Sequence, residues 1–120
     1  MGNIEFGDAG EKIAAAFLRR NGYELLTQNY RTRIGEIDII ARKSGTICFV
    51  EVKTRRNQRF GSPAEAVTYQ KQRKIINTAL IFLKASGNTD TPIRFDIMEV
   101  IAKSTNDAAQ CRHIINAFGY

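Results

Sequence analysis

The sequence lacks the features that mark membrane, secreted and disulfide-bonded proteins. No apolar run in its 120 residues approaches the roughly 20 residues of a membrane-spanning helix. The first residues, Met1 to Phe6, lack the basic and apolar regions of a signal peptide. The two cysteines have neither metal-ligand nor redox spacing. We therefore expect a cytosolic protein without a membrane segment, in which Cys48 is a small buried side chain within an apolar run.

No internal repeat, low-complexity tract or interdomain linker interrupts the chain. A length of 120 residues allows one hydrophobic core but not two. The hydrophobic fraction of 43% and the charged fraction of 25% are those of an ordinary globular protein. We therefore expect residues 1–120 to form a single domain.

Positive charge is concentrated in the middle of the chain, whose formal net charge is +6. Between Arg19 and Lys74 there are 13 Lys or Arg residues against 5 Asp or Glu, whereas the rest of the chain holds 5 against 7. A central basic excess is expected of a protein that binds a polyanion such as nucleic acid. An ordinary basic surface would give the same composition, so charge alone does not decide between them.

Hydrophobic periodicity and turn signals predict two helices. The first is expected at Ala9–Asn21, because Asp8 and Glu11 have the spacing of a capping box and Gly22 suits the helix end. The second is expected to begin at Ser62-Pro63-Ala64-Glu65, after a basic loop, and to continue to about Ala85. Its core-facing residues are expected to be Ile75, Ile76, Ala79, Leu80 and Leu83.

Alternating and apolar segments predict the strands, so that the element order is αβββαβ with one further strand. The strands are expected within Tyr23–Asn29 and at Gly35–Arg42, Thr46–Thr54, Ile93–Ile101 and Ile114–Phe118. Before the last strand, Lys103–Gln110 is polar and is expected to be mobile.

The strands Gly35–Arg42 and Thr46–Thr54 should form a hairpin around the turn Lys43-Ser44-Gly45. Strand alternation puts Ile37, Ile39 and Ala41 on one face, which should match the apolar face of the next strand. A four-residue turn from Lys43 to Thr46 then places Ile37 opposite Val52, Ile39 opposite Val50, Asp38 opposite Glu51 and Glu36 opposite Lys53. A shift of two residues would preserve these faces and change the partners.

Two carboxylates directly opposite each other in a sheet are destabilising, and more so beside apolar residues such as Ile40 and Phe49. A cation would relieve this cost. Lys53 is one candidate, but hard oxygen ligands on adjacent strands suit Mg²⁺ or Mn²⁺ better. The alternative is a solvated sheet face with a Glu36–Lys53 ion pair and an exposed Asp38. The added aspartate, the apolar setting and the basic flanks favour the metal site.

Several segments resemble a family of small bacterial proteins called YraN-like, within the PD-(D/E)xK nuclease superfamily of restriction endonucleases and archaeal Holliday junction resolvases. The matching segments are Gly7-Asp8-Ala9-Gly10-Glu11, Asn29-Tyr30-Arg31, Gly35-Glu36-Ile37-Asp38, Phe49-Val50-Glu51-Val52-Lys53-Thr54-Arg55, Phe60-Gly61-Ser62-Pro63 and Arg94-Phe95-Asp96. They cover most of the chain in order. The resemblance implies an α/β restriction endonuclease-like αβββαβ core with a central mixed sheet flanked by helices.

The resemblance also implies roles for individual residues. The motif's aspartate falls on Asp38, with Ile37 in place of the proline, and its second acid and lysine fall on Glu51 and Lys53. The backbone carbonyl of Val52 is a further candidate metal ligand. Glu11 matches a helix glutamate of the resolvases, and a capping role for it is about as strong an alternative.

Basic residues around the hairpin are candidates for contacts with nucleic-acid phosphates. They are Arg31, Arg33, Arg55, Arg56 and Arg59, together with Lys71 on the second helix, for which a solvated helix face is the favoured alternative. Arg94 and Asp96 are adequately explained by a structural ion pair. His113 is the only histidine, and a structural role is favoured for it over catalysis.

The resemblance implies a Mg²⁺- or Mn²⁺-dependent endonuclease acting on DNA, with branched or junction DNA in recombination or repair as one class of substrate. A homodimer is left open, because resolvases of symmetric junctions pair two sites across a symmetric dimer. Two alternatives remain at this point. One is a nucleic-acid-binding module without useful catalysis, and the other is a structural or protein-interaction domain, which leaves the central basic excess unexplained.

Overall fold

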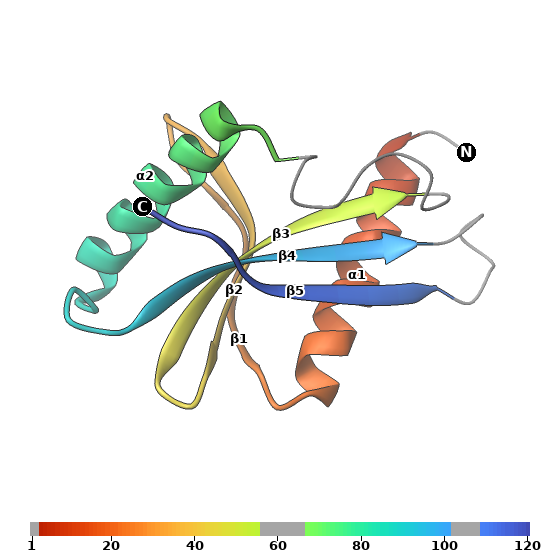
Figure 1. Ribbon diagram of the computed structural model, residues 1–120, viewed down its shortest axis with the longest axis horizontal. Coiled ribbons are helices and arrows are strands. Elements are labelled where there is room, and N and C mark those ends of the chain that lie inside the picture. The colour runs from red at the N-terminus through yellow and green to blue at the C-terminus, as the bar shows by residue number, and fades with distance from the viewer. Residues whose placement is uncertain (1–2, 56–66, 102–108) are drawn as a thin grey trace.

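A five-stranded sheet lies between two helices, one on each face (Figure 1). The computed structural model describes residues 3–55, 67–101 and 109–120. The elements are α1 (Asn3–Arg20), β1 (Glu24–Arg31), β2 (Glu36–Lys43), β3 (Thr46–Arg55), α2 (Tyr69–Ser86), β4 (Ile93–Ile101) and β5 (Gln110–Phe118). This order confirms the expected αβββαβ arrangement with a further strand and the mixed α/β class.

The strands lie in the order in which they occur in the chain, β1-β2-β3-β4-β5. Among the described strands, β3 and β4 pair in parallel, and the other neighbours pair antiparallel. Parallel neighbours need a long crossover, and α2 lies in the connection between them. The sheet is therefore mixed, with its parallel pair flanked by antiparallel strands.

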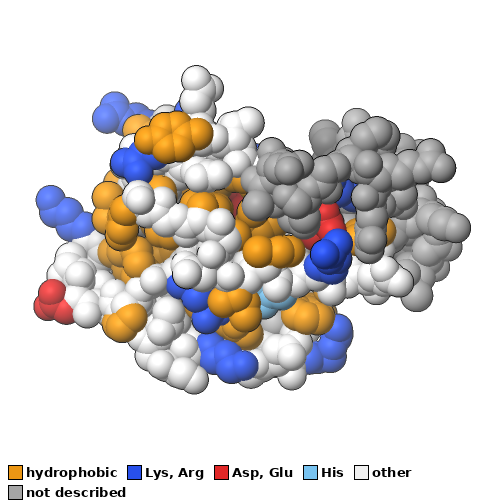
Figure 2. All heavy atoms as spheres, in the orientation of Figure 1, with side chains coloured by type: hydrophobic (Ala, Val, Ile, Leu, Met, Phe, Trp, Pro, Cys, Tyr) orange, Lys and Arg blue, Asp and Glu red, His pale blue; other side chains and the backbone are white. Residues whose placement is uncertain are grey.

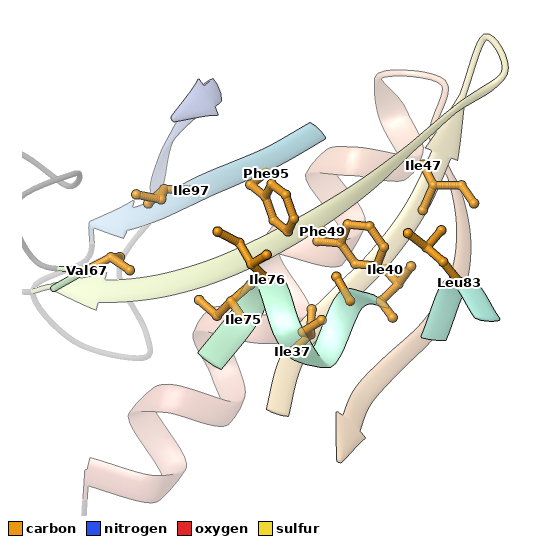
Figure 3. Packing of buried hydrophobic residues seen from close by; sticks show 11 residues of the cluster. Ile37, Ile40, Ile47, Phe49, Val67, Ile75, Ile76, Leu83, Phe95 and Ile97 are labelled. Atoms are coloured by element: carbon orange, nitrogen blue, oxygen red, sulfur yellow. The ribbon is translucent and has the colours of Figure 1, made fainter. Parts of the chain in front are cut away.

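Each helix buries its apolar side against a different face of the sheet. On one face, Ile75 and Ile76 of α2 pack with Phe49, Phe95 and Ile97 of β3 and β4 (Figure 3). On the other face, the cluster is made by Ala14, Ala15 and Leu18 of α1 with Val50 of β3 and Met98 and Val100 of β4. Cys48 is fully buried in this second cluster, as expected.

Helix α1 ends as expected but begins six residues earlier than expected. Gly22 has a φ of +86°, and the backbone N–H groups of Asn21 and Gly22 bond to carbonyls of the last turn, which closes the helix. Because α1 begins at Asn3, Asp8 lies inside the helix and the expected capping box at Asp8 and Glu11 is wrong. No proline interrupts residues 3–8, so the helix continues through Gly7 at only a modest propensity cost.

Gly10 allows α1 to approach β3 closely. A Cβ added at Gly10 would lie 2.0 Å from Oγ1 of Thr54 and 3.1 Å from its Cβ and Cγ2. Rotation of Thr54 can move Oγ1 away from the added atom but cannot move the Thr54 Cβ, which would still lie only 3.1 Å from it. The close approach brings the next helix residue, Glu11, toward the sheet.

We predict that Gly10→Ala lowers the free energy of unfolding by about 1–3 kcal/mol, because it overpacks the contact between α1 and β3. Chemical denaturation checks this. Gly119→Ala is the matched control, since a Cβ there meets nothing within 4 Å. Equal stability of the Gly10 and Gly119 variants would contradict the close approach.

Helix α2 begins at Tyr69, so the expected continuous helix from Ser62 is wrong. Thr68 has an extended backbone, and its side chain accepts a hydrogen bond from the N–H of Lys71, so Thr68 is the N-cap. The predicted start at Ser62–Glu65 lies outside the described residues. Leu80 is 46% exposed, which corrects its expected core position, whereas Ile75, Ile76, Ala79 and Leu83 are buried as expected.

The β2–β3 hairpin has the expected register near its turn. Lys43 pairs with Thr46, and Ile39 pairs with Val50, where the ladder ends. The expected alternation fails beyond this point, because Ile37 packs in the α2 cluster while Ile39 and Ala41 pack in the α1 cluster. Strand β2 therefore turns away from β3 at Asp38, and the two strands form a fork.

Candidate active site

Asp38 lies at the fork between β2 and β3. Its Oδ2 accepts a hydrogen bond from the backbone N–H of Val52 at 2.8 Å. The carboxylate thus takes the place that a backbone carbonyl would occupy if the ladder continued, and it is fixed against β3. The expected direct pairing of Asp38 with Glu51 lies beyond the end of the ladder, but the two carboxyl groups are close enough for each to shift the pKa of the other.

Glu51 is only 6% exposed, although it is a charged residue in the middle of the sheet. Burial raises the pKa of Glu51, and the negative charge of Asp38 raises it further, to about 7. Burial also raises the pKa of Asp38, partly offset by the hydrogen bonds from Val52 and Glu51. The pair is therefore electrostatically costly when both groups are ionised, which is the condition that a bound cation relieves.

Two lysines face the same oxygen of Glu51. Nζ of Lys53 lies 3.9 Å from Oε1 of Glu51, and Nζ of Lys71, which comes from α2, lies 3.1 Å from it. Burial and the neighbouring charge of Lys71 lower the pKa of Lys53. For Lys71, burial would lower the pKa, but the charge of Glu51 and its hydrogen bond raise it. Lys71 thus belongs to the carboxylate cluster, which sequence spacing alone did not indicate.

Glu11 of α1 is electrostatically coupled to the fork. Burial raises the pKa of Glu11, and the charge of Asp38 raises it further, while a hydrogen bond with Asn29 lowers it. The resemblance implied that Glu11 belongs to the acidic group, and the negative charge of Asp38 does raise the pKa of Glu11. Within the described part of the chain, however, no three His, Cys, Asp or Glu residues gather closely enough to hold a metal ion together.

The donor atoms at the fork fit a hard divalent cation. Asp38 and Glu51 offer carboxylate oxygens, and the carbonyl of Val52 points to the same side of β3 as its N–H, toward Asp38. Mg²⁺ is commonly held by one or two carboxylates and completes its coordination with water and substrate oxygens. The two acids and the Val52 carbonyl are therefore a sufficient protein contribution, and Glu11 lies outside that set.

The candidate phosphate-binding arginines lie in different surroundings. Arg31 is exposed and pairs with Glu36 at 3.1 Å, so Glu36 is directed to β1 and not into the alternative pair with Lys53. Arg33 is exposed in the β1–β2 connection. Arg55 is largely buried, with Nε 3.3 Å from Oε2 of Glu99. Arg56 and Arg59 lie outside the described residues.

Glu99 is a buried acid that sequence reasoning missed. It is 1% exposed on β4, directly beside Lys53 of β3, and it pairs with Arg55 and, at 3.7 Å, with Arg112. Its Oε1 has no hydrogen-bond donor among the described residues. The signal for Glu99 was a single acid in the apolar run Ile97–Ile101, which a buried ion pair explains.

A second polar network, centred on Asp96 of β4, holds parts of the fold together. Asp96 is fully buried and accepts hydrogen bonds from Arg94, from the backbone N–H of Asn116 and from Nε2 of His113, at 2.8–3.1 Å. Arg94 also donates to the hydroxyl of Tyr23 at 2.5 Å. These bonds tie β4 to β5 and to the segment after α1. The expected structural ion pair of Arg94 and Asp96 is confirmed, and His113 is part of it.

Comparison with known sequences places the chain in a family. Residues 10–100 match the sequence profile described as "Uncharacterised protein family UPF0102". The chain belongs to this family. It corresponds to the YraN-like proteins that the motifs indicated. Similar UPF0102 proteins occur in Symbiobacterium thermophilum (47% identity, covering 93% of this chain and 94% of that protein) and Clostridioides difficile (47%, covering 98% and 100%).

A third UPF0102 protein, from Chlorobium phaeobacteroides, is 49% identical over 98 residues, which are 82% of this chain and 77% of that protein. None of the described helices is long and apolar enough to cross a membrane. The names of these relatives state no activity, so the function is inferred from the residues at the fork.

Proposed function

We propose that this UPF0102 protein is a Mg²⁺- or Mn²⁺-dependent endonuclease of the PD-(D/E)xK type that hydrolyses phosphodiester bonds in DNA. The single observation that carries the proposal is the pair formed at the fork by half-buried Asp38 and buried Glu51, with Lys53 beside it. Lys53 and Lys71 offset part of the charge of Glu51, but Asp38 forms no ion pair with a Lys or Arg of the described residues. A divalent cation between the two carboxylates would relieve the repulsion that remains. The motif spacing and the αβββαβ order agree with this assignment.

In this proposal Asp38, Glu51 and the Val52 carbonyl hold the metal ion. When bound, Mg²⁺ would polarise the phosphodiester and lower the pKa of a coordinated water. Lys53 orients the attacking water, and its lowered pKa suits it to take part in proton movement at that water. The hydrogen bond from Val52 keeps Asp38 in place before substrate arrives.

Basic side chains near the fork supply the attraction for a polyanion. Arg31 and Arg33 lie at the end of β1 and in its connection to β2, and Lys71 lies on α2. In the view of Figure 2, basic side chains stand around the rim of the face that α2 covers, and acidic side chains are few. Contacts of this kind position a nucleic-acid backbone without reading its sequence. Structure-selective cleavage of branched DNA in recombination or repair is the form of activity that we propose to test first.

The test is cleavage of a panel of linear, flapped, single-stranded and four-way DNA with Mg²⁺ or Mn²⁺. We expect at least one substrate to be cut, and Glu51→Ala to reduce the rate by about 100-fold or more. Glu24→Ala is the matched control, since Glu24 is exposed on β1 and pairs only with Arg42 among the described residues. Cleavage that persists at the same rate in Glu51→Ala would refute the assignment.

A second candidate function is a nucleic-acid-binding module without catalysis. The observation in its favour is that Lys71 already neutralises Glu51, and that only two acids converge at the fork in the described part of the chain. This reading predicts binding of branched DNA with neither Mn²⁺ binding nor cleavage of any member of the panel. The intact Asp38, Glu51 and Lys53 favour the nuclease.

A further inference from the structure

A pocket of about 300 Å³ opens beside the fork, between the start of β2 and the first two turns of α2. Its walls include Gly35 and Glu36 on one side and Gln70, Lys71 and Lys74 on the other. A Cβ added at Gly35 would lie 3.5 Å from Cβ of Lys74 and 2.8 Å from the hydroxyl of Thr78, so Gly35 lies close against the middle of α2. The volume is at the lower end of pockets that hold small ligands.

The charge of the pocket is positive. Lys74 lines it, and no carboxylate in the described residues lies within ion-pair distance of its ammonium group. Glu36 is the one acidic residue among its described walls, and it is already paired with Arg31 at 3.1 Å. The first turn of α2 carries no acidic residue. An anionic ligand therefore finds two lysines and no uncompensated acid.

Lys71 connects this pocket to the fork. It is part of the pocket wall, and its Nζ lies 3.1 Å from Oε1 of Glu51. Its side chain is 45% exposed, so its ammonium group can turn from the carboxylate toward a ligand in the pocket without crossing the core. A group bound in the pocket is consequently within reach of a cation that also contacts the proposed metal-binding acid.

We propose that this pocket is a subsite for a phosphate group of the nucleic-acid strand, next to the bond that is cleaved, and that Lys71 and Lys74 hold that phosphate. The inference rests on the proposed nuclease function and names where the neighbouring nucleotide binds. Two ammonium groups suit a phosphate as point-charge donors, and the amide of Gln70 lies on the same wall for the sugar or base. In this arrangement Lys71 leaves Glu51 when a divalent cation takes its place, and it turns to the phosphate.

The experiment uses thymidine 5′-phosphate as the probe, with thymidine as the phosphate-free control, in EDTA so that no metal contributes. Binding is followed by backbone amide chemical shifts of the full chain. We expect saturable shifts around Gly35, Gln70 and Lys74 with the nucleotide and none with thymidine. Lys74→Met should weaken binding about tenfold, the effect of losing one charged hydrogen bond. Lys71→Met should weaken it less in EDTA, where Lys71 remains paired with Glu51.

Lys84→Met is the matched control, because Lys84 lies in the last turn of the same helix, far along α2 from the pocket. Its affinity for the nucleotide should equal that of the wild type. Equal affinity of Lys74→Met and Lys84→Met, or equal shifts with thymidine, would overturn the subsite. Cleavage of the DNA panel measured in parallel separates the two proposals: Glu51-dependent cleavage without nucleotide binding refutes the pocket and leaves the nuclease in place.

Discussion

Replacing Lys53 by methionine should lower the rate of DNA cleavage by about 10²–10⁴-fold, the range for loss of a group that moves or orients a proton. Lys53 stands 3.9 Å from Oε1 of Glu51, and its side chain is 24% exposed. Methionine preserves the apolar stem and removes the ammonium group. The expected change is therefore in the rate of chemistry at saturating DNA, measured by single-turnover cleavage.

Metal binding should survive this substitution, because Asp38, Glu51 and the Val52 carbonyl remain. Mn²⁺ affinity measured by calorimetry is expected to be unchanged or tighter, since a competing cation has been removed. Lys84→Met again controls for the loss of a positive charge at the surface. A Lys53→Met variant that cuts at the wild-type rate, or that loses Mn²⁺ binding together with activity, would contradict the role assigned to Lys53.

Asp96→Asn should lower the free energy of unfolding by about 3–5 kcal/mol, the usual cost of removing one partner of a buried ion pair. Asp96 is fully buried, and it compensates the charge of Arg94, whose side chain is 22% exposed. The same carboxylate accepts hydrogen bonds from His113 and Asn116, so its neutralisation weakens three contacts at once. Denaturant unfolding at pH 7 measures the loss, and Asp90→Asn, in the exposed α2–β4 loop, should be neutral.

The stability of the wild type should also depend on pH through Asp96. Burial would raise the pKa of the Asp96 carboxyl, but the hydrogen bonds from His113, Arg94 and Asn116 together hold it below its ordinary value. A carboxyl with a depressed pKa in the folded state stabilises the protein above its unfolded pKa, and this contribution is lost as the pH falls through the folded value. Below about pH 4, the unfolded-state value for aspartate, the stability difference between wild type and Asp96→Asn should therefore shrink. A constant difference down to pH 2 would contradict this.

The sequence predicted those parts of the fold that depend on local periodicity. Strand β4 has the expected bounds, Ile93–Ile101. They were predictable because a short apolar run between a loop and a polar segment is typical of a buried strand. The hairpin register was predictable from the turn length and the matching of apolar faces. The family resemblance followed from ordered motifs across most of the chain.

Other features depend on tertiary contacts that the sequence pattern does not contain. The turn of β2 away from β3 at Asp38 depends on which cluster Ile37 joins, and both clusters accept an isoleucine. Lys71 has the pattern of a solvated helix residue, and only the packing of α2 against the sheet brings it to Glu51. The start of α2 was misjudged because Ser62-Pro63-Ala64-Glu65 and Thr68 are both good helix-start signals, and local propensity does not choose between them.

The central claim is that the Asp38 and Glu51 carboxylates repel each other at the fork and that a divalent cation relieves this repulsion. The direct measurement is thermal unfolding of the wild type and of Glu51→Gln at pH 8, first in EDTA and then with Mn²⁺. Since burial and Asp38 raise the pKa of Glu51 from 4.5 to about 7, the ionised group opposes folding above that range, and in EDTA the Gln variant should be more stable. We expect a gain of about 2 kcal/mol, or roughly 8 °C in Tm.

Mn²⁺ should then raise the Tm of the wild type and leave that of Glu51→Gln unchanged, because the variant has lost a ligand and the repulsion that binding relieves. Glu24→Gln, on the exposed part of β1, should respond to Mn²⁺ like the wild type. Equal Mn²⁺ shifts in the wild type and Glu51→Gln, or a Gln variant that is less stable than the wild type in EDTA, would contradict the account.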